Sequence, residues 1–413
     1  MLYLGFLINR NGNIRATVED RIAKASRVSH MILQALRTNR NVSAKLAINL
    51  FDKQIVPILL YGSSVWSVPQ TQNLFYLEEQ PENQNTRTIV AGMSLSTFNR
   101  NVPFEYARRV GRRPEIDASP RKILVKLKLY SDKQELFRLV NDSLFTISNF
   151  VEKESIIEKV HNDFCKKALN ISKYASNMAV QAELGRYPII NSAKSFAVKY
   201  WLRLKSGTEN IVLNEVFKEC TQHEHEWVQG IQSIMCENGF GNVWINPSSV
   251  NKDTFHKYFR KRLNDQHVQN WNTKLTESNR FDTLKILHND YKMENYVKLI
   301  KNPEIREVYT RLRIDMNILS TSKSQSTRQL DRCPFCNEEP ESVGHFLLKC
   351  NKYNTIRSDF ANSISADDQD FNSLTENEKV CYILNVDCPT EIIGNCCKFV
   401  HKIYTMRMED VSI

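Results

Sequence analysis

The sequence CPFCNEEPESVGHFLLKC, at residues 333–350, holds three cysteines and one histidine at spacings typical of a metal site. Cys333 and Cys336 form a C-x2-C pair, and His345 and Cys350 follow as H-x4-C. A two-residue spacer lets two thiolates approach one ion, and tetrahedral zinc takes four N or S ligands, so we predict one structural Zn²⁺ here. The protein fills all four positions, which leaves none for water or substrate. The alternative is a set of unrelated core cysteines beside a histidine that is hydrogen-bonded elsewhere.

The composition is typical of a folded, mainly helical chain with several parts. Its 413 residues suffice for roughly two to four domains. Apolar residues make up 41% and charged residues 25%, which is ordinary for a globular protein. Glycine is scarce, at 12 residues, and the apolar residues mostly recur at helical spacing, so we predict a mainly α fold.

The charge and the cysteines indicate the class of partner and the compartment. A formal charge of +10 and a pI near 9.0 favour a polyanion, nucleic acid before membrane. No stretch approaches the roughly 18 apolar residues that a membrane span needs, and the start MLYLGFLINRNGNIR lacks a signal peptide's basic start and cleavage site. We therefore expect the ten cysteines to lie in a reducing compartment, nucleus or cytoplasm. We predict neither a membrane nor a small-molecule partner, and the oligomeric state stays open.

The first part of the chain shows one strand and two helices in its pattern. The opening YLGFLI, followed by an Asn-Gly pair, predicts a strand entering a turn. Thr17 is the predicted N-cap of a helix over residues 18–37, and Ser43 that of a second helix. Pro57 falls inside the second helical pattern, so we predict a break or kink there.

A polar stretch at residues 68–90 is interpreted as a linker, and a basic segment follows it. Residues 100–128 hold nine Lys/Arg and three acids. Alternating apolar and lysine residues over 125–129 predict a half-buried strand, with a helix after it at 132–147.

This basic segment is the candidate nucleic-acid contact. Phe104 and Tyr106 lie within it and can stack on unpaired bases. Guanidinium groups around a turn can grip phosphates in pairs. The predicted contact residues are Arg108, Arg109, Arg112, Arg113, Arg121, Lys126 and Lys128. The alternative is a solvated charged turn.

The N-terminal stretches resemble one family, the reverse transcriptases of non-LTR (LINE-like) retrotransposons, downstream of their polymerase active site. YLGFLINRNG with RIAKA at residues 21–25 is similar to the strand and helix that open the thumb. QIVPILLYGSSVW at residues 54–66 is similar to the thumb's closing helix with its Pro-x-x-x-Tyr-Gly-x-x-x-Trp ending. The stretches at residues 158–189 and 199–204 resemble the helical segment beyond the thumb.

The cysteine stretch resembles the same family's terminal Cys-Cys-His-Cys segment. It continues into the Cys-x-x-Tyr-x-x-x-Arg tail at Cys350, Tyr353 and Arg357. The basic insert departs from that family. NVPFEYARRVGRRPEIDASPRKILVKL instead resembles the C-terminal domain of the elements' RNA-binding companion protein, with Lys122 in place of a proline of its Pro-Arg-Pro-Ile-like strand.

No polymerase centre is expected within this chain. Nucleotide addition needs carboxylates that hold two metal ions, which in this family come from paired aspartates between strands. The Asp367-Asp368 pair lies in SISADDQDF, without apolar strands beside it, so we interpret it as a solvated loop. The resemblance implies that the palm precedes residue 1. We expect no catalytic residue, and no nuclease cluster after Cys350.

Several other residues are interpreted as structural. The run KYFRKRL at 257–263 predicts an amphipathic helix with a wet basic face, with RNA contact as the alternative. We place His223 and His225 on the surface rather than at a metal. The remaining assignments to packing or helix ends are Glu183, Gly185, Arg186, Trp66, Trp201, Trp271, Cys381, Cys396 and Cys397.

These predictions combine into four segments. We expect a thumb-like helical segment at 1–70, a linker with a basic α+β insert at 71–150, a helical domain at 151–325, and the zinc segment with terminal helices at 326–413. The resemblance implies an RNA- or DNA-binding remnant of a non-LTR reverse transcriptase with a structural zinc. The alternatives are a fragment of an RNA-directed DNA polymerase whose palm lies upstream, and a retroelement-derived gene product without function.

Overall fold

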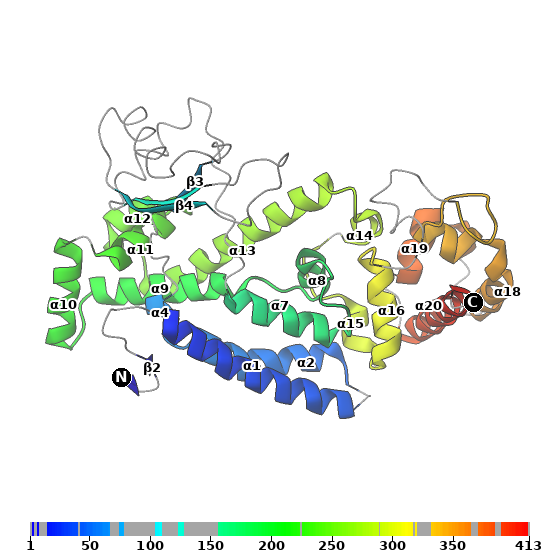
Figure 1. Cartoon of the computed structure of the whole chain (residues 1–413), viewed down its shortest axis with the longest axis horizontal. Helices are drawn as coiled ribbons and strands as arrows, with labels where there is room; N and C mark the ends of the chain where they lie inside the picture. Colours follow the sequence, from blue (N-terminus) through cyan, green and yellow to red (C-terminus); the bar gives the residue numbers. More distant parts are fainter. Residues whose placement is uncertain are drawn as a thin grey trace. The chain divides into compact units, whose positions relative to one another are not determined.

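The structure, a computed structural model, describes the greater part of the chain, and in that part the protein is mainly helical, as predicted (Figure 1). The described residues are 2–3, 6–7, 15–39, 42–66, 74–77, 104–109, 123–127, 156–223, 225–288, 290–316, 319, 332–364, 371–384 and 390–411. Internal contacts divide the chain into two compact units. The first unit takes residues 1–61, 156–192 and 260–413, and the second takes 62–155 and 193–259. The four-segment division stays a prediction.

The first unit consists of helices with one short hairpin. Its strands β1 (Leu2–Tyr3) and β2 (Phe6–Leu7) pair antiparallel. Its helices and short turns are α1 (Arg15–Thr38), α2 (Ala44–Leu50), η1 (Phe51–Ile55), α3 (Val56–Leu60), α7 (Ile156–Ala168), α8 (Asn177–Glu183), α14 (Asp282–Leu287), α15 (Asn295–Leu299), α16 (Pro303–Arg313), η4 (His345–Lys349), η5 (Asn351–Tyr353), α18 (Asn354–Ile364), η6 (Phe371–Ser373), α19 (Glu376–Leu384) and α20 (Thr390–Val411).

The second unit combines helices with a three-stranded sheet. Its elements are α4 (Ser63–Trp66), β3 (Leu74–Leu77), β4 (Phe104–Arg109), β5 (Ile123–Leu127), α10 (Ile211–Gln222), α11 (Glu226–Glu237), α12 (Gly241–Ile245) and η2 (Pro247–Ser249). Two long helices, α9 (Ile189–Lys205) and α13 (Lys252–Glu277), contribute residues to both units.

The start of the chain differs from its prediction in two details. The single strand over YLGFLI is wrong, because Leu2 pairs with Leu7 and Tyr3 with Phe6, which folds the run back on itself. Helix α1 begins at Arg15, so Thr17 lies buried inside the first turn and does not cap it. Helix starts of this kind shift by one or two residues because the first turn has free N–H groups.

The second predicted helix is confirmed, together with its cap and its irregularity. The Ser43 hydroxyl accepts a hydrogen bond from the backbone N–H of Leu46, at the start of α2. Before Pro57 the chain widens into the π-helix η1, after which α3 continues. A proline lacks the N–H that the ladder needs, so a local change of helix type is the expected response.

The sheet of the second unit has the order β3-β5-β4, with both pairs antiparallel. The predicted strand is confirmed at residues 125–127, and it starts earlier, at Ile123. Strand β3 lies inside the predicted linker, so that interpretation is wrong for residues 74–77. Their aromatic and leucine residues, LFYL, have high strand propensity, which the surrounding Asn and Gln residues masked. The predicted helix at 132–147 lies outside the described residues.

Each unit has an aromatic core. In the first unit the Phe51 and Phe164 rings lie 4.7 Å apart, and neither side chain is exposed. In Figure 1, α1 lies alongside α2 in this part of the chain. In the second unit Trp201 stacks on Trp244 at 4.7 Å. The prediction of a core role is confirmed for Trp201 and for Trp271, which is 4% exposed.

The end of α8 shows the predicted stop signal. Gly185 has a φ of 57°, and its N–H donates to the carbonyl of Ala182 while Arg186 N–H donates to Gln181. This pair of bonds satisfies the last carbonyls of the helix. A Cβ at Gly185 would lie 2.3 Å from the backbone nitrogen of Met293, so the position also needs glycine for space.

Candidate metal centre

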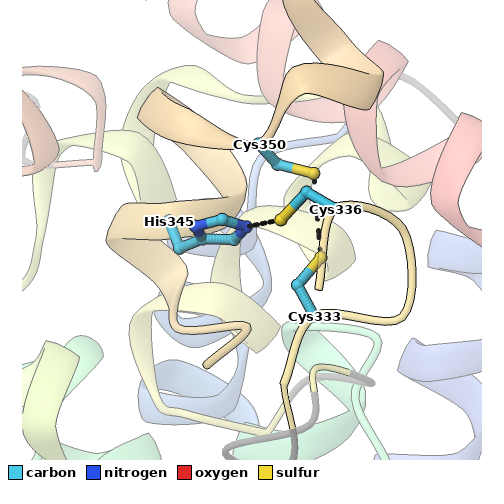
Figure 2. A group of neighbouring side chains, drawn as sticks. All are labelled: Cys333, Cys336, His345 and Cys350. Carbon is cyan, nitrogen blue, oxygen red and sulfur yellow. Dashed lines mark hydrogen bonds between the residues drawn. The ribbon is translucent and has the colours of Figure 1, made fainter. Parts of the chain in front are cut away.

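The four predicted ligands lie together in the first unit, as Figure 2 shows. Their ligand atoms all lie within 4.8 Å of one another. The Sγ atoms of Cys333 and Cys350 are 3.7 Å apart, and Sγ of Cys336 is 3.3 Å from Nε2 of His345. The first distance far exceeds a disulfide bond of about 2.05 Å, so the two sulfurs are separate thiols. The group is arranged to hold one metal ion.

A tight loop positions the first two cysteines. The Cys333 N–H donates to the carbonyl of Glu339 over 2.8 Å, which closes the loop. Inside it the Asn337 N–H donates to the Cys333 carbonyl over 2.9 Å. Asn337 has a φ of 56°, a conformation that asparagine tolerates better than most residues. The loop therefore presents Cys333 and Cys336 on one side, as Figure 2 shows.

A π-helical turn positions the other two ligands. His345 begins η4 and Cys350 follows its last residue, and the Cys350 N–H donates to the His345 carbonyl over 2.9 Å. The Ser342 hydroxyl accepts from the His345 N–H at the start of the turn. Single π-turns are rare, and they occur often at functional sites. Here the turn brings both ligand side chains toward the loop cysteines.

The site is closed to solvent on most sides. Cys333, His345 and Cys350 are each 1% exposed, and Cys336 is half-buried. Burial raises the pKa of Cys350 to about 12. Burial also opposes ionisation of Cys336, but hydrogen bonds from the backbone of Glu338 and Glu339 bring the pKa of that thiol below its usual value. These backbone donors favour a thiolate at the more accessible ligand.

The remaining nitrogen of His345 faces a carboxylate. Its Nδ1 lies 3.6 Å from Oε2 of Glu339, which is slightly beyond hydrogen-bond distance. Glu339 is also 3.4 Å from Nζ of Lys349. A carboxylate behind a metal-binding histidine is a common arrangement, because it orients the ring and increases its basicity.

A buried ion pair fixes the site to the last helix. Arg407, on α20, donates from Nε and Nη2 to the two carboxylate oxygens of Glu341, at 2.7 and 3.0 Å. Its guanidinium also lies 4.7 Å from the ring centroid of Phe335, inside the cysteine loop. The sequence analysis did not identify Glu341 and Arg407, and their separation of 66 residues leaves no local signal.

The predicted nucleic-acid contacts are only partly described. Arg108 and Arg109 end β4, opposite Leu124 and Ile123 of β5, and Lys126 lies in β5. Their backbone pairing places them on one small sheet in the second unit. The other predicted contacts lie outside the described residues: Arg112, Arg113, Arg121 and Lys128.

The secondary candidates have structural positions. The run at 257–263 lies in α13, with Phe259 and Leu263 buried and Tyr258 66% exposed, so the amphipathic prediction is confirmed. The His225 side chain accepts from the Trp227 N–H and caps α11. The other outcomes are that His223 is exposed, Cys396 and Cys397 are buried, Cys381 is half-buried, and Asp367 and Asp368 lie outside the described residues.

A second polar network of the first unit was not predicted in full. Arg186 donates from Nη1 and Nη2 to both carboxylate oxygens of Asp52, at 2.8 and 2.6 Å, and from Nε to Nε2 of His161. Because Nε2 of His161 accepts this bond, Nδ1 carries the ring proton toward Glu158, 3.2 Å away. Glu158 in turn accepts from the Ile190 N–H. His161 is fully buried, so this chain of bonds joins helices within the first unit.

Comparisons with known proteins give no relative: no family model, no curated protein and no solved structure matches the chain. None of the helices that the structure describes is long and apolar enough to cross a membrane.

Proposed function

We propose that Cys333, Cys336, His345 and Cys350 bind one structural Zn²⁺. Bonds of about 2.3 Å to sulfur and 2.0–2.1 Å to nitrogen imply ligand separations of about 3.8 Å between thiolates and about 3.5 Å between thiolate and imidazole at a tetrahedral ion. The separations of 3.7 and 3.3 Å support such an ion. Three thiolates and a histidine are a donor set that zinc favours over magnesium or calcium.

The role of this ion would be to stabilise the fold. Every coordination position would be filled by protein, so neither water nor substrate would reach the metal. Three thiolates and Zn²⁺ leave one net negative charge. Nζ of Lys352 lies 5.6 Å from the ring centroid of Phe335, which belongs to the cysteine loop, so a positive charge is close by.

The chain as a whole is, on this proposal, a nucleic-acid-binding part of a non-LTR retrotransposon reverse transcriptase. The observation that carries the binding role is a basic face of the second unit formed by α9 and α13. These helices are joined where the Ser195 hydroxyl donates to the carbonyl of His256 over 2.9 Å. The family assignment is supported by the sequence resemblance described above.

Both helices carry exposed cations and exposed aromatic rings. Phe196, Lys199 and Arg203 follow one another at helical spacing on α9, and all three are exposed. Lys257 and Tyr258 are exposed on α13. Burial, and then the charges of Lys199 and Lys257, hold the pKa of His256 below its usual value, which is consistent with positive potential there. The side chains of Lys199, Arg203 and Lys257 are therefore accessible to a ligand from solvent.

Such a face suits a phosphate backbone. Each Lys or Arg that neutralises a phosphate releases counterions, so binding should weaken as salt rises. The exposed rings of Phe196 and Tyr258 can stack on unpaired bases. This favours single-stranded nucleic acid as the partner over a neutral or acidic protein.

Binding of fluorescent single-stranded RNA and duplex DNA across a salt series tests this function. The triple variant Lys199→Ala, Arg203→Ala, Lys257→Ala should reduce the slope of log K against log salt by about 2–3, about one per lost contact. A charge-matched control, Lys274→Ala, Lys298→Ala, Lys301→Ala, replaces exposed lysines elsewhere and should keep the slope. A folded wild-type protein that binds neither probe at low salt would overturn the function. Equal losses in both triple variants would place the contacts elsewhere.

A further inference from the structure

A cavity of about 290 Å³ lies beside the metal centre in the first unit. The residues after His345 form one wall, because Leu347, Leu348 and Lys349 belong to η4. The other walls come from α18, η6, α19 and α20. Pockets for drug-sized ligands start at roughly 300 Å³, so this one is sized for a single ring system.

The floor of the cavity is aromatic. Phe360 and Phe399 stack with ring centroids 4.2 Å apart and planes at 13°, and both are nearly buried. Phe371 meets Phe360 edge-on at 6.1 Å and is half-buried, so part of its ring remains accessible. Rings in this arrangement favour a flat, apolar guest.

The rim of the cavity is basic. Among the residues that the structure describes, Lys349, Arg357 and Lys379 line it together with one acid, Glu376. Glu376 is 2.8 Å from Nζ of Lys349 and so already has a cationic partner. Lys379 Nζ donates only a long bond, 3.3 Å, to the Asn372 carbonyl, and it lies 5.7 Å from the Phe371 ring. The described part of the lining therefore carries net positive charge.

Arg357 supplies an unused donor. Its Nη2 donates to the carbonyl of the metal ligand Cys350 and to Oδ1 of Asn354, which fixes the guanidinium beside the metal site. Its Nη1 is buried and has no hydrogen-bond partner among the described residues. A buried donor left without a partner costs about 1–3 kcal/mol, and an anionic oxygen is its strongest acceptor.

From these features we infer that the cavity receives the base of one unpaired nucleotide, with its phosphate at Arg357 and Lys379. The half-buried ring of Phe371 would hold the base by stacking, and the positive charges of Arg357 and Lys379 on the lining would attract the phosphate. A paired base within a duplex cannot enter a cavity of this size. The inference rests on the proposed nucleic-acid binding and names a single-strand site within it, separate from the basic face of the second unit.

Phe371→Ala tests the site, with single-stranded RNA and duplex DNA compared at one salt concentration. Because base stacking contributes about 1–3 kcal/mol, the variant should bind the single strand roughly 5- to 150-fold more weakly and the duplex unchanged. Lys398→Ala, an exposed lysine on α20, is the control and should change neither. Phe371→Leu keeps the apolar volume without the ring face, so it should remain folded and still lose affinity for the single strand.

A cross-link gives a second readout that does not depend on the variants. An oligonucleotide that carries 5-iodouracil should cross-link to the peptide that contains Phe371 after irradiation of the wild-type protein. Single-strand binding that survives in Phe371→Ala and Phe371→Leu, with the cross-link elsewhere, would overturn the site and leave the proposed function standing. If an acidic, phenylalanine-containing peptide covers Phe371 and the oligonucleotide does not, the cavity belongs to a protein partner. That result would also overturn the proposed nucleotide site. If the wild-type protein binds no nucleic acid at all, the proposed function itself is refuted.

Discussion

Arg313 donates from Nε to Oε2 of Glu183 over 2.8 Å, and neither side chain is exposed to solvent. Arg313 Nη2 also lies 3.0 Å from Glu294, and Nη1 donates to the carbonyl of Leu384. His288 lies 3.5 Å from the second Glu183 oxygen. One buried guanidinium therefore joins α8 and α16 to the end of α19 in the first unit.

Arg313→Met should destabilise the first unit strongly. Removing one partner of a buried pair leaves the other charge without compensation, at a cost of about 3–5 kcal/mol. Arg311→Met is the matched control on the same helix, because Arg311 is partly exposed and pairs with Glu307 at 2.7 Å. It should cost at most about 1 kcal/mol. Urea denaturation checks this, and equal losses in both variants would contradict the role assigned to Arg313.

The Glu183 carboxylate should make the first unit sensitive to acid. Burial alone would raise the pKa of Glu183, but the charge of Arg313 and the bond from His288 lower it to about 2. A carboxyl with a lowered folded-state pKa stabilises the protein above its ordinary pKa of about 4.5, and that contribution is lost as pH falls toward about 2.

A comparison of melting temperatures measures this effect. The melting temperature of the wild type should exceed that of Glu183→Gln by a constant difference above about pH 5. This difference should shrink as pH falls below about 4.5. A margin that stays constant down to about pH 3 would show that Glu183 does not change its ionisation between the folded and unfolded chain.

Gly185→Ala should cost more than the same change at Gly207. Both glycines have positive φ, 57° and 81°, so each substitution carries the left-handed backbone penalty of about 1–2 kcal/mol. Gly207 has open space around it, whereas a Cβ at Gly185 would meet the backbone of Lys292 and Met293. The free energies of unfolding of the two variants separate the steric cost of a Cβ from the cost of the backbone conformation. Equal losses of stability would refute the close approach of Gly185 to the backbone of Lys292 and Met293.

The arginines of the basic insert give an independent prediction. Replacing Arg108, Arg109, Arg112 and Arg113 with alanine should reduce the salt slope of nucleic-acid binding by about one per lost phosphate contact. The comparison is with the α9–α13 triple variant described above. An unchanged slope would restrict the contacts to the helical face.

Some features were predictable because their determinants are local. The metal ligands fall in one short stretch, the Ser43 cap acts on residues within one turn, and Gly185 ends its own helix. The amphipathic helix at residues 257–263 was predictable from its local pattern, and the structure buries Phe259 and Leu263 on its apolar side.

Other features depend on partners far along the chain. Glu183 and Arg313 are 130 residues apart, and Glu341 and Arg407 are 66 apart, so no spacing rule connects them. Strand β3 was missed because it needs β5, nearly fifty residues later in the sequence, to become a strand. The cavity beside the metal centre is built from five elements, and its residues are unremarkable in the sequence.

The metal content of freshly purified, reduced protein tests the zinc-stabilised fold most directly. We predict about one zinc ion per chain, retained in Cys236→Ser, whose exposed thiol lies outside the site, and lost in Cys336→Ser and His345→Asn. Folded protein without zinc, or zinc content unaffected by the two ligand variants, would contradict the assignment of these four residues as its ligands.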